Sequence, residues 1–103
     1  MRESELERYF CDRLKKLGCL VYKFVSPGNA GVPDRLVVLP GGGVMFFELK
    51  APGGRPRSLQ KAQIARLKKQ GCTVGVIDSR QKADRWIADL KNLIAKWGEE
   101  SSG

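Results

Sequence analysis

The spacing of apolar residues changes along the chain, and each change predicts a different kind of element. Apolar residues three or four positions apart are typical of amphipathic helices, and three segments have this spacing: residues 3–17, 58–70 and 81–97. Short runs rich in β-branched and aromatic residues are typical of strands, and four segments are of this kind: residues 19–24, 34–39, 44–50 and 73–77. A glycine follows each of the first two helices, as is typical of helix ends, and Ser58 is expected to be the N-cap of the second.

The order of these elements, a helix, three strands, a helix, a strand and a last helix, predicts one α/β domain. Three consecutive strands can pair as a meander, whereas the helix before the fourth strand allows a crossover connection. The sheet is therefore expected to be small and mixed, with the apolar stripe of the last helix packed against it. The 103 residues are enough for one domain, which we assign to residues 1–98, and residues 99–103 are expected to be a disordered tail.

Composition restricts the functions that such a domain can have. The net charge of +8 favours a polyanionic partner such as nucleic acid, or an anionic membrane surface. Because the chain has no histidine, it has no imidazole base or ligand, which excludes zinc-finger, HNH-type and Cys/His nucleophile sites. Three widely spaced cysteines favour reduced thiols over a disulfide framework or a zinc site. Since the sequence has no secretory signal and no membrane span, an intracellular protein is expected.

Acidic residues are almost absent from the middle of the chain. Across residues 13–77, only Asp34 and Glu48 are acidic, whereas twelve residues are basic. Taken alone, each acid would more often be a turn residue or half of a surface ion pair. Together, beside apolar strand residues and far from other acids in the sequence, they favour a functional site.

The hairpin that joins two of the strands sets the distance between these carboxylates. With a loop at residues 40–42, the register places Asp34 opposite Glu48; shifted by one residue, it places Asp34 opposite Leu49, between Glu48 and Lys50. Opposed side chains on one face lie roughly 5 Å apart, where like charges repel, so a cation is expected between them. Oxygen ligands favour Mg²⁺ or Mn²⁺ over zinc. Strand alternation puts Lys50 on the face of Glu48, where it could orient or deprotonate a water, or balance charge on a phosphate.

Two helical residues are further candidates for the site. Glu7 borders the inward face of the first helix, where it could contact the site or a second metal, or only complement the helix dipole. Gln60 aligns with the inward stripe of the second helix, where it could bond a phosphate, a metal-bound water or Lys50, or only cap the backbone. Residues 50–70 include seven basic residues and no acid, which predicts a surface that contacts phosphates.

Several short motifs in this sequence resemble those of a known family. Pro33-Asp34 and Glu48-Leu49-Lys50 resemble the PD-(D/E)XK nuclease signature, and the order of elements resembles its restriction-endonuclease-like core. A wider set resembles the VRR-NUC family over about residues 3–78: Lys-Phe-Val-Ser-Pro-Gly at 23–28, Gly-Val-Pro-Asp-Arg at 31–35, Glu-Leu-Lys-Ala at 48–51, and Gln60. The resemblance implies that Asp34, Glu48 and the Leu49 carbonyl bind the metal and that Lys50 is catalytic. It also implies site roles for Gln60 and for a glutamate of the first helix; Glu7 matches that position, although Glu3 lies one turn earlier.

The residues and the resemblance together predict a Mg²⁺- or Mn²⁺-dependent endonuclease that hydrolyses DNA and uses no small-molecule cofactor or membrane. Similarity to the small Holliday-junction resolvases implies selectivity for branched DNA and a homodimer with two sites. We assign the DNA contacts to basic residues: Lys23, Arg35, Arg55, Arg57 and Lys61. A stand-alone module of this family implies the cytoplasm of a bacterial or phage-infected cell. The alternatives are a catalytically silent DNA-binding module and an RNase H-like nuclease, whose sheet normally precedes its helices.

Overall fold

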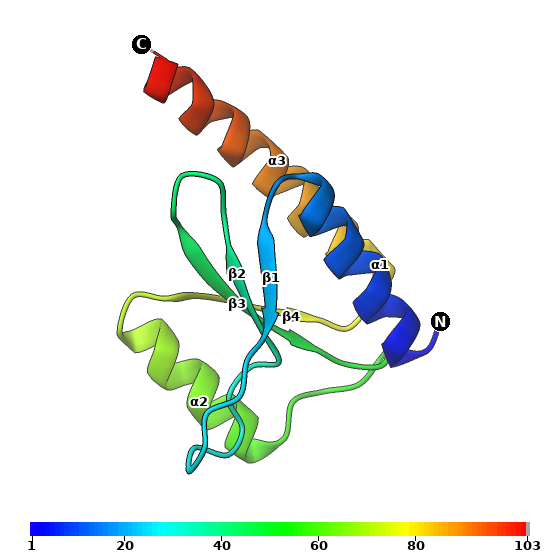
Figure 1. Cartoon of the computed structure of the whole chain (residues 1–103). Helices are drawn as coiled ribbons and strands as arrows, with labels where there is room; N and C mark the ends of the chain where they lie inside the picture. Colours follow the sequence, from blue (N-terminus) through cyan, green and yellow to red (C-terminus); the bar gives the residue numbers. More distant parts are fainter. Residues whose placement is uncertain (103) are drawn as a thin grey trace.

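Over residues 1–102, the part of the chain that the computed structural model describes, helices and strands follow one another in the predicted order (Figure 1). Side chains are described for residues 1–98. The elements are α1 (Glu3–Lys16), β1 (Leu20–Lys23), β2 (Arg35–Val38), β3 (Val44–Leu49), α2 (Ser58–Lys69), β4 (Thr73–Ile77) and α3 (Arg80–Ser102). Within this described part, none of the helices has the length and apolar composition that crossing a membrane requires.

The strands form one mixed sheet in the order β1-β2-β3-β4. β1, β2 and β3 pair antiparallel as a meander, and β4 joins β3 in parallel after the crossover through α2. The predicted topology is therefore confirmed. It makes β3 a central strand, bonded on both edges, whose C-terminal end carries Glu48.

The register of the hairpin between β2 and β3 decides how the two isolated acids lie. Arg35 pairs with Phe47 in this ladder. Continuing the same pairing by one residue places Asp34 opposite Glu48, which is the first of the two registers that the loop length allowed. The two carboxylates therefore lie on neighbouring strands, at the same end of the sheet.

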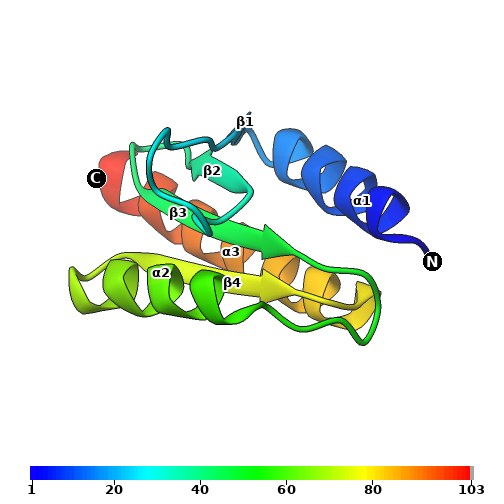
Figure 2. The same ribbon diagram turned by 90° about the horizontal axis from the view of Figure 1, so that it is seen from below.

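The helices cover the two faces of the sheet unequally. α1 and α3 pack against each other on one face, whereas α2 lies on the other face and contacts β4 (Figure 2). The main core lies under α1 and α3 and is formed by buried apolar residues: Leu6, Phe10, Leu14, Val37, Phe47, Leu49, Ile77, Ala83 and Leu90. The predicted apolar stripe of the last helix is confirmed, because its remaining members pack against this core: Trp86, Ile87, Ile94 and Trp97.

Side chains of β3 alternate between these two faces. Phe47 points into the main core, whereas Phe46 packs against Phe24 on the opposite face, with ring centroids 5.3 Å apart. Because successive residues of a strand alternate, Glu48 and Lys50 belong to the Phe46 face. The predicted sharing of one face by the glutamate and the lysine is thus consistent with the packing.

β4 passes the core at a point that has no room for a side chain. A Cβ atom on Gly75 would lie 2.8 Å from the Phe47 ring and 2.9 Å from the Trp86 ring. The Phe47 ring is also packed edge-on against Phe10 and Trp86, with both centroid separations at 5.0 Å. Glycine at this position therefore allows the close approach of β4 to the rings of Phe47 and Trp86.

The segment that joins β1 to β2 rests on the first turn of α2. Gly31 has φ of +90°, and a Cβ atom there would lie 2.7 Å from the carbonyl oxygen of Leu59. Gln63 Nε2 donates a hydrogen bond of 3.4 Å to the carbonyl of Ala30. The loop that leads to Asp34 is therefore fixed against the helix.

The start of α2 corrects one prediction. Ser58 is the first helical residue rather than the N-cap, and Arg57 occupies the N-cap position with an extended backbone. Gln60 Oε1 accepts a hydrogen bond of 2.8 Å from the Arg57 N–H. The prediction was wrong by one residue because the side chain that satisfies the free amide comes from within the helix, not from a preceding serine.

The third helix starts one residue earlier and ends later than predicted. Ser79 Oγ accepts a hydrogen bond of 3.1 Å from the Lys82 N–H and so acts as the N-cap. α3 then continues to Ser102, so residues 99–102 follow a helical backbone where the sequence predicted a disordered tail. Gly98 does not end the helix, because one glycine costs a helix only about 1 kcal/mol. The last residue of the predicted tail, Gly103, lies outside the described residues.

Candidate active site

Glu48 is an ionisable residue at a buried position, where a charge is energetically unfavourable. Its exposed fraction is 0%, and it lies near the end of the central strand. Neither carboxyl oxygen has a hydrogen-bond partner among the described residues. A buried carboxylate without hydrogen bonds costs several kcal/mol, on the order of 2–7 even for a neutral polar group, so this side chain is poorly explained by stability alone.

Asp34 holds its position beside Glu48 through the backbone of β3. Its Oδ2 atom accepts a hydrogen bond of 2.9 Å from the N–H of Leu49, the residue that follows Glu48. Burial raises the pKa of the Glu48 carboxyl to about 8, and the nearby Asp34 carboxyl contributes to the increase. The two acids are therefore close enough to repel each other, as the hairpin register predicts.

Lys50 is the basic member of the same group. Its backbone N–H donates a hydrogen bond of 2.9 Å to Ile77, which extends the pairing of β3 with β4 by one residue. The side chain is half-buried, and its positive charge acts against the increase in the pKa of Glu48. The predicted grouping of Asp34, Glu48 and Lys50 at one end of the sheet is therefore present.

The oxygen atoms at this end of the sheet suit a divalent ion. Across residues 1–98, no three side chains of histidine, cysteine, aspartate or glutamate gather into a metal-binding cluster. The acidic side chains of the site are therefore Asp34 and Glu48, to which the resemblance adds the carbonyl of Leu49. The two buried oxygens of Glu48, which have no hydrogen-bond partner within the described part of the chain, are groups that an oxygen-preferring ion such as Mg²⁺ or Mn²⁺ would satisfy. The donor set fits such an ion.

The predicted helix glutamate has a partner that the sequence analysis missed. Glu7 forms an ion pair with Arg35, and Arg35 Nη1 also donates a hydrogen bond of 3.1 Å to the carbonyl of Asp34. Glu3, Glu7 and Asp34 all border one pocket of about 300 Å³. The structure therefore brings both candidate glutamates to the edge of the site, and it connects Glu7 to Asp34 through Arg35.

A signal for this ion pair was present in the sequence. Arg35 directly follows Asp34 in a strand, so it must point to the opposite face, which is the one that α1 covers. Glu7 lies on the inward border of α1, so opposite charges on facing surfaces could have been paired. Arg35 had been assigned to DNA, and here its guanidinium is occupied by Glu7.

The other predicted residues lie around this centre. Gln60 caps α2 through its bond to Arg57, and no hydrogen bond or ion pair between described residues joins it to Asp34, Glu48 or Lys50. Its catalytic role stays a prediction. The predicted DNA contacts other than Arg35 are all exposed: Lys23, Arg55, Arg57 and Lys61. The three cysteines are free, and burial raises the pKa of two of them, Cys11 and Cys19.

Two acids and a lysine at one end of a mixed sheet, with helices on both faces, form the arrangement expected of an α/β nuclease. A sequence model of the VRR-NUC domain matches residues 4–81. The chain is 48% identical over 80 residues to "Putative nuclease p44" of Acyrthosiphon pisum secondary endosymbiont phage 1. This match covers 78% of this chain and 86% of that protein. A solved structure of a VRR_NUC domain superposes with a TM-score of 0.78 at 34% identity, covering 84% of this chain and 94% of the other.

The chain therefore belongs to the VRR-NUC family. The family and the phage relative both support a nuclease. The fold class inferred from the sequence, a small mixed sheet between helices, is confirmed by the structural match.

Proposed function

We propose that this protein is a Mg²⁺- or Mn²⁺-dependent endonuclease of the PD-(D/E)XK type that hydrolyses phosphodiester bonds in DNA. The observation that carries the proposal is the Glu48 carboxyl: it is fully buried beside Asp34 and Lys50, and neither of its oxygens has a hydrogen-bond partner among the described residues. A structural ion pair would satisfy its oxygens, and a solvated surface acid would be exposed.

Each residue then has a distinct part in the reaction. Asp34, Glu48 and the carbonyl of Leu49 would hold the ion, which when bound would polarise the phosphate and lower the pKa of the attacking water. The Leu49 N–H keeps the Asp34 carboxylate at its place through Oδ2. Lys50 Nζ provides positive charge where charge develops on the phosphate and a donor that orients the nucleophile.

Cleavage assays with matched variants test this proposal. Asp34→Asn and Lys50→Ala are expected to lose at least about 100-fold in cleavage of DNA with Mg²⁺ or Mn²⁺, as typical for loss of an electrostatic group in a site, while DNA binding persists. Asp89→Asn and Lys91→Ala, the same chemical changes at exposed positions of α3, are the controls. Wild-type cleavage rates in both site variants would refute the assignment.

The same proteins separate a nuclease from a silent DNA-binding module. Mn²⁺ is expected to raise the melting temperature of the wild type, because it binds the folded chain, and Asp34→Asn should remove that increase. DNA binding without either a Mn²⁺ effect or cleavage would favour the silent module. Four-way, flap and linear DNA should be compared, because we propose selectivity for branched DNA such as Holliday junctions.

A homodimer is part of the proposal and is supported by an apolar face of the sheet. On the face where α2 contacts only β4, Leu20, Tyr22 and Val44 have exposed fractions of 54%, 53% and 46%. Leu20 and Tyr22 belong to β1, and the ladders place Val44 of β3 in line with Leu20 through Val38 of β2. The two tryptophans, Trp86 and Trp97, pack against the core instead. Exposed apolar residues on one face of a sheet are typical of an interface.

Measurement of the mass in solution tests the dimer. The wild type is expected at twice the chain mass, and Tyr22→Asp should shift it to the monomer, whereas the exposed-site variant Asp89→Asn should not. A monomeric wild type would refute the dimer and leave the cleavage chemistry to be judged by its own assay.

The phage relative supports a further proposal, that the protein acts in the cytoplasm of a bacterial or phage-infected cell.

A further inference from the structure

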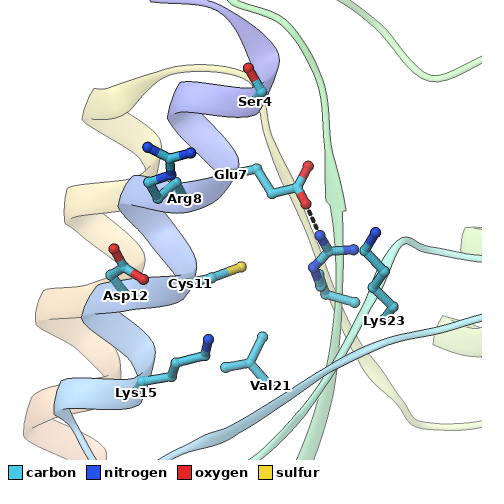
Figure 3. Close-up of a pocket in the computed structure, with 9 residues that line it drawn as sticks. Ser4, Glu7, Arg8, Cys11, Asp12, Lys15, Val21 and Lys23 are labelled. Atoms are coloured by element: carbon cyan, nitrogen blue, oxygen red, sulfur yellow. Dashed lines mark ion pairs between the residues drawn. The ribbon is translucent and has the colours of Figure 1, made fainter.

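A second hollow lies between α1 and β1, next to the candidate active site. Its volume is about 450 Å³. Figure 3 shows Glu7, Cys11 and Lys15 on the α1 side, with Val21 and Lys23 on the strand side. β1 is an edge strand, so this cleft is bounded by a helix and a sheet edge.

The cleft is continuous with the edge of the candidate active site. Glu7, Lys23 and Arg35 line both this cleft and the pocket of about 300 Å³ that contains Asp34. The negative charge of Glu7 at this junction is neutralised by its ion pair with Arg35. The residues shared by the two hollows therefore carry a net positive charge, that of Lys23, whereas Glu3 borders only the pocket that contains Asp34.

The charges along the cleft favour an anion. Arg8, Lys15 and Lys23 line it, and none of them has an ion-pair partner within residues 1–98; Asp12 is the acid that opposes them. The thiol of Cys11 adds no negative charge, because burial raises its pKa. Cations that are separated along a cleft suit a polymer with repeated negative charges better than a single small anion.

We propose that this cleft binds the sugar–phosphate backbone of the cleaved DNA strand next to the scissile phosphate, with Lys15 and Lys23 in contact with phosphates. The inference rests on the proposed function, since it assigns the continuation of that substrate. Lys15 and Arg8 are new members of the DNA interface, and Lys23 receives a definite place in it. Lys15 belongs to α1, so the bound DNA strand would run along α1. This is a different surface from the basic segment at residues 50–70.

Binding measured against salt concentration tests the cleft directly. Fluorescence anisotropy of a labelled four-way junction is followed over a series of KCl concentrations in EDTA, where no cleavage takes place. Lys15→Ala and Lys23→Ala are each expected to reduce the slope of log Kd against log [KCl] by about 1, and the double variant by about 2, because each phosphate contact releases counterions. The matched control is Lys16→Ala, which changes the neighbouring exposed lysine of α1 outside the cleft.

The outcomes distinguish this inference from the proposed function. If the cleft binds the strand, the double variant binds roughly tenfold more weakly than the Lys16→Ala control at moderate salt. Slopes and affinities equal to those of Lys16→Ala would overturn the cleft, even if Asp34→Asn abolishes cleavage. Absence of metal-dependent cleavage in the wild type would instead refute the proposed function, and the salt slopes would still decide whether DNA occupies the cleft.

Discussion

Replacing Glu48 with glutamine is expected to stabilise the metal-free protein at pH 8, although it removes a group proposed to be essential for cleavage. The wild-type carboxyl is fully buried and has no hydrogen-bond partner among the described residues. Glutamine has nearly the same shape and no charge at any pH. The substitution therefore removes the cost of a buried charge while it keeps the packing.

The size of this effect follows from the pKa of Glu48, which is raised from 4.5 to about 8 by burial and by Asp34. Below pH 4.5 the carboxyl is protonated in the folded and the unfolded chain, and its contribution to stability is fully present. As the pH rises to 8, only the unfolded chain releases the proton, so that contribution is lost. At about 1.4 kcal/mol per pH unit, the free energy of unfolding should fall by roughly 3 kcal/mol between pH 5 and pH 8. For a domain of this size, the melting temperature should fall by about 10 °C or more.

Thermal unfolding in EDTA between pH 5 and pH 8 measures the difference. Wild type and Glu48→Gln should melt within a few degrees of each other at pH 5, and the variant should be the more stable at pH 8. Asp89→Asn, at an exposed position, should follow the wild type throughout. Adding Mn²⁺ at pH 8 should stabilise the wild type alone. Parallel curves for wild type and Glu48→Gln over the whole pH range would refute the reasoning.

Three further substitutions test contacts described above. Gly31→Ala should lower the free energy of unfolding in urea by about 3 kcal/mol, because the φ of +90° and the backbone of Leu59 both oppose a Cβ atom. The control Gly28→Ala, with φ of +82° in open space, should lower it by only about 1 kcal/mol. Equal losses would show that the contact with Leu59 is unimportant. Gln60→Ala should lower the free energy of unfolding by about 1 kcal/mol, whereas Gln60→Glu should leave it almost unchanged, since glutamate keeps the acceptor for the Arg57 N–H. A loss of cleavage in Gln60→Glu at unchanged stability would instead reveal a catalytic role. Gly75→Ala should cost about 2 kcal/mol through overpacking against aromatic rings, and a neutral effect on the melting temperature would mean that the core can yield.

The fold was predictable because its main determinants are local or periodic. Helical and strand spacings identified the elements, and a three-residue hairpin loop left only two registers to choose between. The ends of helices were harder to place, because a cap depends on one side chain. Arg57 is not a residue typical of an N-cap, and its amide is satisfied by Gln60 from the following turn. Likewise, nothing in the spacing of apolar residues indicates that α3 continues past Gly98.

The candidate site was predictable to the extent that one hairpin determines it. Asp34, Glu48 and Lys50 are brought together by pairing of adjacent strands, which the sequence constrains strongly. The contact of Glu7 with Arg35 depends instead on the angle and depth at which α1 crosses the sheet, and these follow from packing of the whole core. The burial of Glu48 also required the structure, because the pattern of β3 reads the same whether its last residues are covered or exposed.

The seat of the β1–β2 loop on α2 has a mechanical consequence. Gly31 lies against the backbone of α2, and only Val32 and the buried Pro33 separate it from Asp34, so the connection from the helix to the acid is short. If a DNA duplex docks on α2 and displaces it, Asp34 is expected to move with the helix. DNA binding and the position of the Asp34 carboxylate would then be coupled.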